Sequence, residues 1–239
     1  MDGIVDIHCH IIYDVDDGAK TIVESKKMLA LAYAEGVRTI IATPHFWRGA
    51  FECPAQMIKE RYQEIKHLAK SVGDGMEILL GCECYANSEL VHDLKASKCL
   101  TMAGSKHILV EFSEETEFAY IREQIYELIC NGYQPIIAHV ERYHRIEESH
   151  IEELVAMGAT MQVNAGSIIG EDGFKIKRRC KQMMKKDLLS FVGSDAHGSA
   201  TRPPKLRRCA DYIEKKMGKE YAYKILIENP KSIIQAGVN

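Results

Sequence analysis

Short apolar runs that end beside a histidine or a carboxylate recur along this chain, and they limit the folds that it can adopt. Six such runs occur, at residues 4–7, 38–42, 76–80, 107–110, 135–138 and 190–193. The side chains that follow them are His8, His10, His45, Glu83, Glu111, His139, Asp195 and His197. Residues so far apart in the sequence can meet only if the runs are parallel strands that share one end. In a barrel of alternating strands and helices, the active-site residues lie at that shared carboxyl end.

Helical segments separate these runs. Residues 21–35 carry apolar side chains at helical spacing, and Gly36 then ends the segment as helix-terminating glycines do. The whole pattern predicts seven strands, including one at residues 160–164, each followed by a helix. Repeated units of this kind favour right-handed crossovers and a parallel sheet or barrel. The length of 239 residues is slightly short for an eight-fold barrel of roughly 250 residues, so we expect residues 1–239 to form one α/β barrel domain.

The composition argues against several classes of protein. The hydrophobic fraction of 46% and the net charge of -3 are ordinary for a globular protein and do not suggest a nucleic-acid or anionic-membrane binder. No stretch approaches the ~20 apolar residues of a membrane span, and the first strand begins too early to leave room for a signal peptide. None of the eight cysteines shows C-x-x-C spacing, so we interpret them as reduced. We therefore expect a cytoplasmic protein without membrane insertion.

The residue types at the strand ends indicate metal binding, because imidazole and carboxylate groups are the ligands of divalent transition metals. His8 and His10 are two residues apart on a strand, so both side chains can face one ion, and Asp195 and His197 repeat the spacing. Each residue alone also fits a core or surface-loop position. Six strand ends that all carry potential ligands, with Asp17 in the acidic segment after the first strand, predict a multinuclear site at the barrel mouth.

The charges of the predicted ligands bear on the number of ions. Four carboxylates, those of Asp17, Glu83, Glu111 and Asp195, supply four negative charges. Two divalent ions neutralise them, whereas three leave an excess of positive charge that matches a phosphate dianion. We favour three ions, and two ions assisted by arginines remain an alternative. The identity of the metal stays open, because manganese, iron and zinc share these ligands.

Three arginines lie in loops that follow predicted ligands, and a guanidinium can bind phosphate oxygens in a bidentate manner. We interpret Arg142 and Arg202 as catalytic, phosphate-binding groups. Arg48 is a further candidate for substrate binding, although a solvated surface charge explains it equally well.

These parts predict a mechanism for phosphate ester hydrolysis. A hydroxide that bridges two ions ~3.5–4 Å apart attacks phosphorus in line, while the arginines stabilise the charge on the remaining oxygens. No covalent phosphoenzyme is expected. Cysteine-dependent tyrosine phosphatases need an arginine six residues after the nucleophilic cysteine, and no cysteine of this chain has one.

Other features each have two interpretations. The basic segment 175–186 fits a nucleic-acid binder, but its apolar residues recur at helical spacing and favour an amphipathic helix with a solvated basic face. The pair at residues 46–47, Phe-Trp, either caps the barrel rim or packs against a substrate ring. Asp6 either orients a metal ligand or is a satisfied core residue. Asn229 and Pro230 resemble an N-cap and the first turn of a terminal helix.

Several short segments together resemble the polymerase-and-histidinol-phosphatase (PHP) superfamily. More narrowly, they resemble its manganese-dependent protein-tyrosine phosphatases of bacterial capsular and exopolysaccharide operons. The segments are residues 6–10, 16–18, 43–45, 81–83, 111–112, 139–143 and 193–197. The likeness extends through residues 202–204 to residues 228–230, and the sequences H-x-E-R-Y and S-D-A-H are its most specific elements. Val140 is one departure, because relatives often carry proline or isoleucine there.

The resemblance implies a distorted TIM-like (β/α)7 barrel, the PHP fold, with three manganese or iron ions. It implies that Arg142 and Arg202 contact phosphate. It also implies that the substrate is the phosphotyrosine-bearing tail of a bacterial tyrosine autokinase that controls polysaccharide export. The implied metal ligands are His8, His10, Asp17, His45, Glu83, Glu111, His139, Asp195 and His197.

Three other functions stay open on the residues alone. The first is a histidinol-phosphate phosphatase or another small-molecule phosphatase of the superfamily, which would use the same metals. The second is a nuclease, against which the net charge of -3 counts. The third is a non-catalytic binding module, against which the intact set of ligands counts. The sequence does not indicate an oligomeric state.

Overall fold

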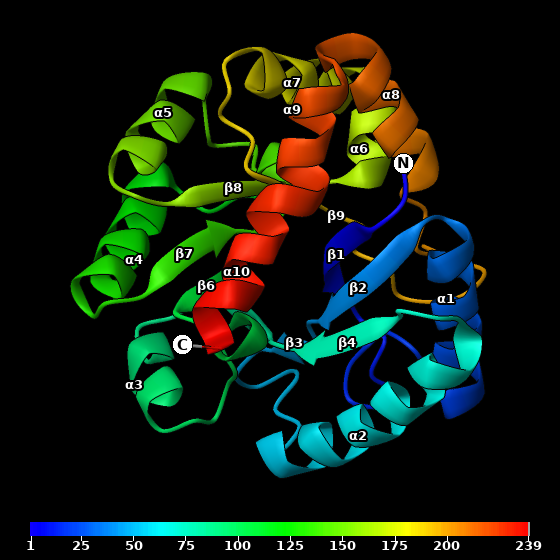
Figure 1. Cartoon of the computed structure of the whole chain (residues 1–239). Helices are drawn as coiled ribbons and strands as arrows, with labels where there is room; N and C mark the ends of the chain where they lie inside the picture. Colours follow the sequence, from blue (N-terminus) through cyan, green and yellow to red (C-terminus); the bar gives the residue numbers. More distant parts are fainter. Residues whose placement is uncertain (239) are drawn as a thin grey trace.

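Parallel strands form the centre of the molecule, which the computed structural model describes for residues 1–238. The strands are β1 (Ile4–Cys9), β2 (Val37–Ala42), β3 (His45–Phe46), β4 (Glu77–Leu80), β5 (Glu83–Tyr85), β6 (His107–Glu111), β7 (Gln134–Ile137), β8 (Thr160–Asn164) and β9 (Phe191–Gly193). They form two parallel sheets, β1-β2-β4 and β3-β5-β6-β7-β8-β9. A parallel bridge between Cys9 and Ala196 joins β1 to the chain that leaves β9. The sheets curl around a common interior (Figure 1), and the predicted distorted TIM-like barrel is confirmed.

Two of the seven predicted strands are interrupted. The run that begins as β2 resumes as β3 after Thr43 and Pro44, and the run that begins as β4 resumes as β5 after Gly81 and Cys82. Proline cannot donate a hydrogen bond to a strand ladder, so Pro44 favours a break there. The breaks leave β2 and β4 in the smaller sheet and bring β3 and β5 into the larger one. The other five predicted strands are present, and β9 begins one residue later than the predicted run at residues 190–193.

Apolar side chains fill the barrel at positions that precede the predicted ligands along several of the strands. This inner cluster consists of Val5, Ile7, Ile41, Met102, Leu109, Ile136, Ala138, Phe191 and Ile233. Met102 belongs to η1 (Met102–Gly104), which leads into the first residue of β6, and Ile233 comes from the C-terminal helix. The barrel is therefore closed by apolar contacts at the end away from the ligands.

A bulge in β1 sets the direction of the first two predicted ligands. Between Asp6 and Cys9, β1 advances three positions while its partner β2 advances only two. A bulge adds one residue to a strand and redirects the side chains that follow it. The bulge explains how Ile7 packs into the inner cluster while its neighbour His8 contacts the other predicted ligands.

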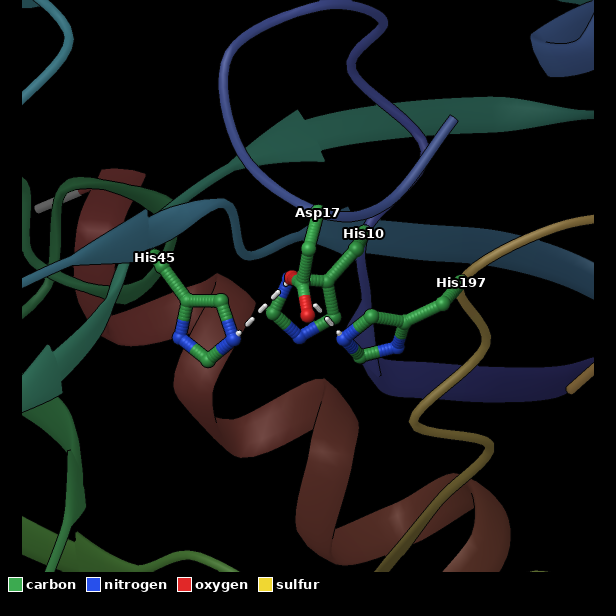
Figure 2. Close-up of side chains that lie close together, drawn as sticks. All are labelled: His10, Asp17, His45 and His197. Atoms are coloured by element: carbon green, nitrogen blue, oxygen red, sulfur yellow. Dashed lines mark ion pairs between the residues drawn. The ribbon is translucent and has the colours of Figure 1, made fainter. Parts of the chain in front are cut away.

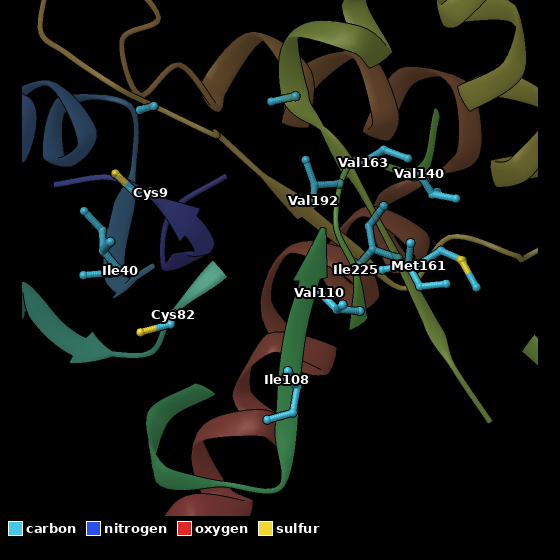
Figure 3. Packing of buried hydrophobic residues seen from close by; sticks show 14 of the residues in the cluster. Cys9, Ile40, Cys82, Ile108, Val110, Val140, Met161, Val163, Val192 and Ile225 are labelled. Carbon is cyan, nitrogen blue, oxygen red and sulfur yellow. The ribbon is translucent and has the colours of Figure 1, made fainter. Parts of the chain in front are cut away.

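Helices cover the outer faces of the sheets (Figure 1). They are α1 (Ile22–Ala34), α2 (Ala55–Val72), α3 (Leu90–Lys95), α4 (Phe118–Cys130), α5 (Glu148–Ala156), α6 (Ala165–Ile169), α7 (Phe174–Lys185), α8 (Arg207–Met217), α9 (Lys219–Tyr223) and α10 (Asn229–Val238), with short helical turns η2 (Val140–Arg142) and η3 (Lys224–Glu228). Their buried sides and the outward-facing strand residues form a second, larger cluster. Figure 3 shows part of it, with Ile40 of β2, Val110 of β6 and Ile225 of η3.

The basic segment of the chain is helix α7, and its amphipathic character is confirmed. Cys180, Met183 and Met184 are buried against the rest of the molecule, whereas most of its basic side chains are exposed. Within residues 1–238, no helix combines the length and the apolar character needed to cross a membrane.

A terminal helix, α10, begins at Asn229 as predicted, but the predicted role of Asn229 as its N-cap is wrong. Asn229 has helical backbone angles, with φ -58° and ψ -49°, and follows directly on η3. Its side-chain Nδ2 donates a hydrogen bond to the carbonyl oxygen of Ser190 instead of capping a helix. η3 is a π-helical turn, and such turns commonly accompany sites where the ordinary helical hydrogen bonding is broken. Pro230, which lacks an N–H, can therefore lie inside a continuous helical segment.

Gly193 allows β9 to approach β1 closely, and its replacement provides a test of barrel closure. A Cβ at position 193 would lie 2.5 Å from the Cβ of His8, which is closer than two carbons can pack. We expect Gly193→Ala to lower the free energy of unfolding by about 1–3 kcal/mol through overpacking. Urea unfolding of the chelator-treated protein measures this change.

Gly166→Ala is the matched control for this substitution. A Cβ at Gly166 in α6 would meet the end of the flexible Glu171 side chain, 3.0 Å away, which can move aside. We expect this variant to be as stable as the unchanged protein or slightly more so, because alanine favours helix. Equal effects of the two substitutions would contradict the proposed close contact between β9 and His8.

Candidate metal centre

All nine predicted ligands meet at the carboxyl end of the strands. Each lies 3.0–3.6 Å from another member of the set through a nitrogen–oxygen contact. They are His8 of β1 and His10 just after it, Asp17 of the following loop, His45 of β3, Glu83 of β5, Glu111 of β6, His139 after β7, and Asp195 and His197 after β9. The barrel topology therefore brings together residues that span almost the entire chain.

One group of four lies toward the outside of the site (Figure 2). The carboxylate of Asp17 stands between two imidazoles, with Oδ1 3.5 Å from Nε2 of His45 and 3.4 Å from Nε2 of His197. The ring of His10 lies 3.9 Å from that of His197 and 4.4 Å from that of His45, measured between centroids. The four potential donor atoms all lie within 4.8 Å of one another, a spacing that a single ion can span.

A second group lies deeper in the barrel. The Nε2 atoms of His8 and His10 are 3.2 Å apart, and they lie 3.1 Å and 3.2 Å from Oε2 of Glu83. A third group joins His45, Glu83 and Glu111. The three groups share His10, His45 and Glu83, so they form one continuous cluster of donor atoms rather than separate sites.

The remaining two predicted ligands connect the groups. Nε2 of His139 lies 3.0 Å from Oε1 of Glu83 and 3.4 Å from Oε1 of Glu111. Oδ1 of Asp195 lies 3.6 Å from Nε2 of His8 and 3.5 Å from Nδ1 of His197. Glu83 and Asp195 thus offer carboxylate oxygens to several imidazoles at once, as bridging ligands would.

The hydrogen bonding within residues 1–238 fits a cluster that is built for cations. Nδ1 of His45, Oε2 of Glu111 and Nε2 of His197 are buried and make no hydrogen bond in that part of the chain, although each lies 3.2–3.7 Å from a group of opposite charge. Buried polar atoms normally have partners, because an unsatisfied one costs free energy. Divalent transition metals bind nitrogen and oxygen donors of this kind. The residues present therefore fit a metal centre.

The pKa shifts that the protein alone produces in this cluster also fit a site for cations. Burial disfavours the charged form of Glu83, which is 1% exposed, yet the charge of His8 and contacts with His10 and His139 lower its pKa. Burial also opposes protonation of His139, but contacts with Glu111 and Glu83 outweigh it and raise its pKa to about 10. The protein alone thus compensates its buried carboxylates with imidazolium charge and, at Asp195, with the guanidinium of Arg202, a role that metal cations would share.

Gln162 of β8 is a residue of the site that the sequence analysis missed. Its Oε1 accepts a hydrogen bond from the backbone N–H of His139 and lies 3.1 Å from Nδ1 of His8. Its Nε2 donates to Oδ1 of Asn164, whose Nδ2 donates to Oδ2 of Asp195. This amide chain therefore leaves Nε2 of His8 free to bind an ion and holds Asp195 in place. Such supporting hydrogen bonds commonly tune metal affinity.

Asp16 is a second missed residue, although it lies beside the predicted ligand Asp17. Its Oδ2 lies 2.8 Å from Nδ1 of His10 and accepts a hydrogen bond from the backbone N–H of His45 at 2.9 Å. Burial opposes its ionisation, but contact with His10 outweighs this and lowers the pKa of Asp16. The sequence signals for Asp16 were its position in the acidic segment and in the family-like segment 16–18.

Backbone geometry also holds the site. Asp6 accepts hydrogen bonds from the backbone N–H groups of His8 and Ser194, so it joins β1 to β9 instead of contacting an imidazole. His139, Asp195 and Arg202 have positive φ angles of 30°, 51° and 52°. Non-glycine residues rarely adopt this conformation, and such strain is concentrated at functional sites.

The three predicted arginines have different surroundings. The guanidinium of Arg202 lies 2.6 Å from Oδ2 of Asp195, and that of Arg142 lies 3.6 Å from the same oxygen. Both side chains are partly exposed at the rim of the metal centre. Arg48 instead forms a bidentate ion pair with Asp93 of α3. Its predicted contact with substrate stays a prediction.

Comparisons with known proteins agree with this geometry. A family model described as capsular polysaccharide synthesis, CpsB/CapC, matches residues 4–235. The chain is 36% identical over 238 residues to the tyrosine-protein phosphatase CpsB of Streptococcus pneumoniae. The matched region covers 97% of this chain and 98% of that protein.

Solved structures extend the likeness to the fold. One match comes from crystal structures of YwqE from Bacillus subtilis and CpsB from Streptococcus pneumoniae, described as unique metal-dependent tyrosine phosphatases. It has a TM-score of 0.90 and 33% identity, covering 98% of this chain and 95% of the other. An amidohydrolase from Mycoplasma synoviae has a TM-score of 0.68 at 15% identity, covering 97% and 87% of the two chains, and this likeness concerns the fold alone.

Replacement of Gln162 tests whether the amide chain supports metal binding. We expect Gln162→Leu to lower the affinity for manganese by about 10- to 100-fold, because His8 loses the partner of its Nδ1 atom. Titration of the chelator-treated protein with manganese, followed by elemental analysis, measures the affinity and the stoichiometry.

Gln124→Leu is the control, because Gln124 is also a buried glutamine but belongs to the outer helix α4. We expect this variant to bind manganese as the unchanged protein does. If Gln162→Leu also keeps the original affinity, Gln162 has no role in orienting His8.

Proposed function

Because the chain belongs to the CpsB/CapC family of capsular polysaccharide synthesis and is a metal-dependent tyrosine-protein phosphatase, we propose that its nine converging ligands hold three manganese ions that serve the hydrolysis of phosphotyrosine. The observation that carries the proposal is the cluster of nine imidazole and carboxylate groups at one end of the barrel. Iron or zinc are the alternatives to manganese, because the same donor types bind all three metals.

Three ions suit the arrangement of the donor atoms better than one. Nine ligands exceed the roughly six positions around a single manganese ion, and the donor atoms fall into three overlapping groups. When bound, such ions activate water for in-line attack on phosphorus and stabilise the attacking and leaving oxygens. Glu83 and Asp195 supply the carboxylates that lie between the groups, and Gln162 keeps the donor nitrogen of His8 directed at them.

Arg142 and Arg202 bind the phosphoryl group in this proposal. Both guanidinium groups lie at the rim of the cluster and reach Oδ2 of Asp195. A phosphate that enters the site meets two planar groups that can donate paired hydrogen bonds to its oxygens. They would stabilise the negative charge that develops on those oxygens during the reaction.

The thiols of the chain do not provide an alternative nucleophile. Burial raises the pKa of Cys82 to about 12, and Cys9 and Cys84, which are also buried near the site, have raised pKa values for related reasons. A nucleophilic cysteine needs a lowered pKa and an accessible sulfur. We therefore propose direct attack by water on phosphorus without a covalent phosphoenzyme.

We also propose a partner and a compartment. The substrate is the tyrosine-rich tail of a bacterial autokinase that controls capsular or exopolysaccharide synthesis, in keeping with the family to which the chain belongs. The eight cysteines are all free, as in proteins of a reducing environment. We place the reaction in the cytoplasm, where such a kinase tail would be accessible.

Metal removal and substrate comparison test the proposed function. We expect a chelator to abolish hydrolysis of a phosphotyrosyl peptide and manganese to restore it. The same assay with histidinol phosphate serves as the comparison, and hydrolysis of that compound alone would identify a small-molecule phosphatase instead. Added methanol should yield no methyl phosphate, because a covalent phosphoenzyme would transfer its phosphoryl group to the alcohol.

The role of Arg202 gives a separate prediction. We expect Arg202→Ala to keep the manganese content of the unchanged protein and to lower kcat/KM for the phosphotyrosyl peptide by about 100- to 1,000-fold, as the loss of one stabilising donor does in other enzymes. Arg208→Ala, at an exposed position in α8, is the control and should leave both quantities unchanged. Unchanged kinetics in Arg202→Ala would remove this residue from the proposed phosphate site.

A further inference from the structure

Beside the metal centre lies an aromatic surface that the mechanism does not use. We propose that Trp47, Phe51 and Tyr85 form a wall that receives the phenyl ring of phosphotyrosine and selects aryl over alkyl phosphate esters. The inference rests on the proposed function, because it assumes that the phosphoryl group binds at the metal ligands.

Strand register puts this wall directly outside the ligands. β3 and β5 are parallel neighbours, and His45 pairs with Glu83 in their register. Tyr85, the last residue of β5, lies two residues after Glu83 on the same face of the strand, and Trp47 directly follows the end of β3. Their rings stack with centroids 4.2 Å apart and planes inclined by 7°. One strand pair thus carries a layer of ligands and, beyond it, a layer of rings.

Phe51 extends the aromatic layer onto a ligand. Its ring lies 5.2 Å from that of His45 at an angle of 14°, and 6.4 Å from that of Trp47. The backbones of Trp47 and Phe51 exchange two hydrogen bonds of 2.8 Å, which close a tight turn. The turn therefore fixes two of the three rings relative to the metal centre.

The ion pair of Arg48 anchors this turn. Its guanidinium makes two contacts of 2.5 Å with the carboxylate of Asp93, which is fully buried in α3. A bidentate pair of this kind fixes both the position and the plane of the guanidinium. In the proposal, Arg48 is a positioning residue that acts through Trp47 and Phe51.

The depth of the wall matches phosphotyrosine. Adjacent residues of a strand are about 3.3 Å apart, so the backbone at Tyr85 lies about 6.5 Å beyond that at Glu83. The phenyl ring of phosphotyrosine begins directly after the ester oxygen and would extend through this level. A phosphoserine would have to bring its main chain to the same depth, against the rings. The side chain of Trp47 is 37% exposed, so the stacked pair remains open to an incoming ring.

Trp47 is the only tryptophan of the chain, which makes its fluorescence a direct probe of the wall. We expect phenylphosphonate, a stable aryl analogue, to change the emission of the manganese-loaded protein and to bind about 3- to 10-fold more tightly than methylphosphonate. In Tyr85→Leu, which keeps the probe, this preference should fall to near unity. Tyr126→Leu, at an exposed tyrosine of α4, is the control and should keep it.

Steady-state kinetics of the Trp47→Leu variant provide a second test of the wall. Trp47→Leu should raise KM for a phosphotyrosyl peptide by about 3- to 10-fold while leaving the inhibition constant of inorganic phosphate unchanged. Inorganic phosphate contacts the ligands and arginines but carries no ring, so it reports whether the metal centre is intact.

The outcomes separate this inference from the proposed function. If the unchanged protein does not hydrolyse the phosphotyrosyl peptide with manganese, the proposed function fails and the wall fails with it. If the peptide is hydrolysed but Tyr85→Leu prefers phenylphosphonate as strongly as the unchanged protein does, the wall alone is overturned. A parallel loss of inorganic phosphate binding in Trp47→Leu would also overturn it, because the rings would then serve only to support the ligands.

Discussion

The structure depends on the burial of carboxylates among imidazoles at the open end of the barrel. Glu83 and Asp195 are only 1% and 4% exposed, and an ion in such a place is costly unless opposite charge surrounds it. In the protein alone, that charge can come only from protonated histidines and the nearby arginines. Divalent cations would supply this positive charge with less repulsion, because one ion would replace several protonated imidazole rings that lie within hydrogen-bonding distance of one another. The barrel therefore has its apolar core at one end and, at the other, a layer of buried charges that bound metal would balance. This division explains why the inner cluster stops where the ligands begin.

The barrel brings these groups together, and local irregularities of its strands adjust their positions. Parallel strands bring their carboxyl ends together whatever their distance in sequence. The bulge in β1 then directs His8 into the site, and Gly193 lets β9 approach so closely that the backbone of Asp195 can donate to the carbonyl oxygen of His8. The positive φ of His139 and Asp195 has the same effect, because each residue leaves its strand at an angle that no regular extension would give. The regular strands thus place the ligands approximately, and the bulge and the positive φ angles set the final direction of their side chains.

The sequence predicted the features that repeat and missed those that depend on a single tertiary contact. The strands, the nine converging residues and the amphipathic α7 could be predicted because apolar periodicity and residue type carry the information locally. Gln162 gave no such signal, since an amide within a buried strand becomes important only when β8 lies beside His8 and His139. The pairing of Arg48 with Asp93 was equally hidden, because the two are 45 positions apart and on unrelated elements. Asn229 was misread for a related reason: its cap-like sequence is overridden by the helical segment that precedes it.

The same register that aligns the ligands also determines what can be built around them. His45 and Glu83 are cross-strand partners, and Trp47 and Tyr85, two residues further along each chain segment, stack on each other beyond these ligands. Residues at this second level can change without disturbing the ligands, since they touch the metal layer mainly through the stacking of Phe51 on His45. If the rings select the ester as proposed, hydrolysis and choice of ester depend on two successive layers at the same end of the barrel. A metal centre held in this way can be kept constant while the layer above it is adapted to a different leaving group.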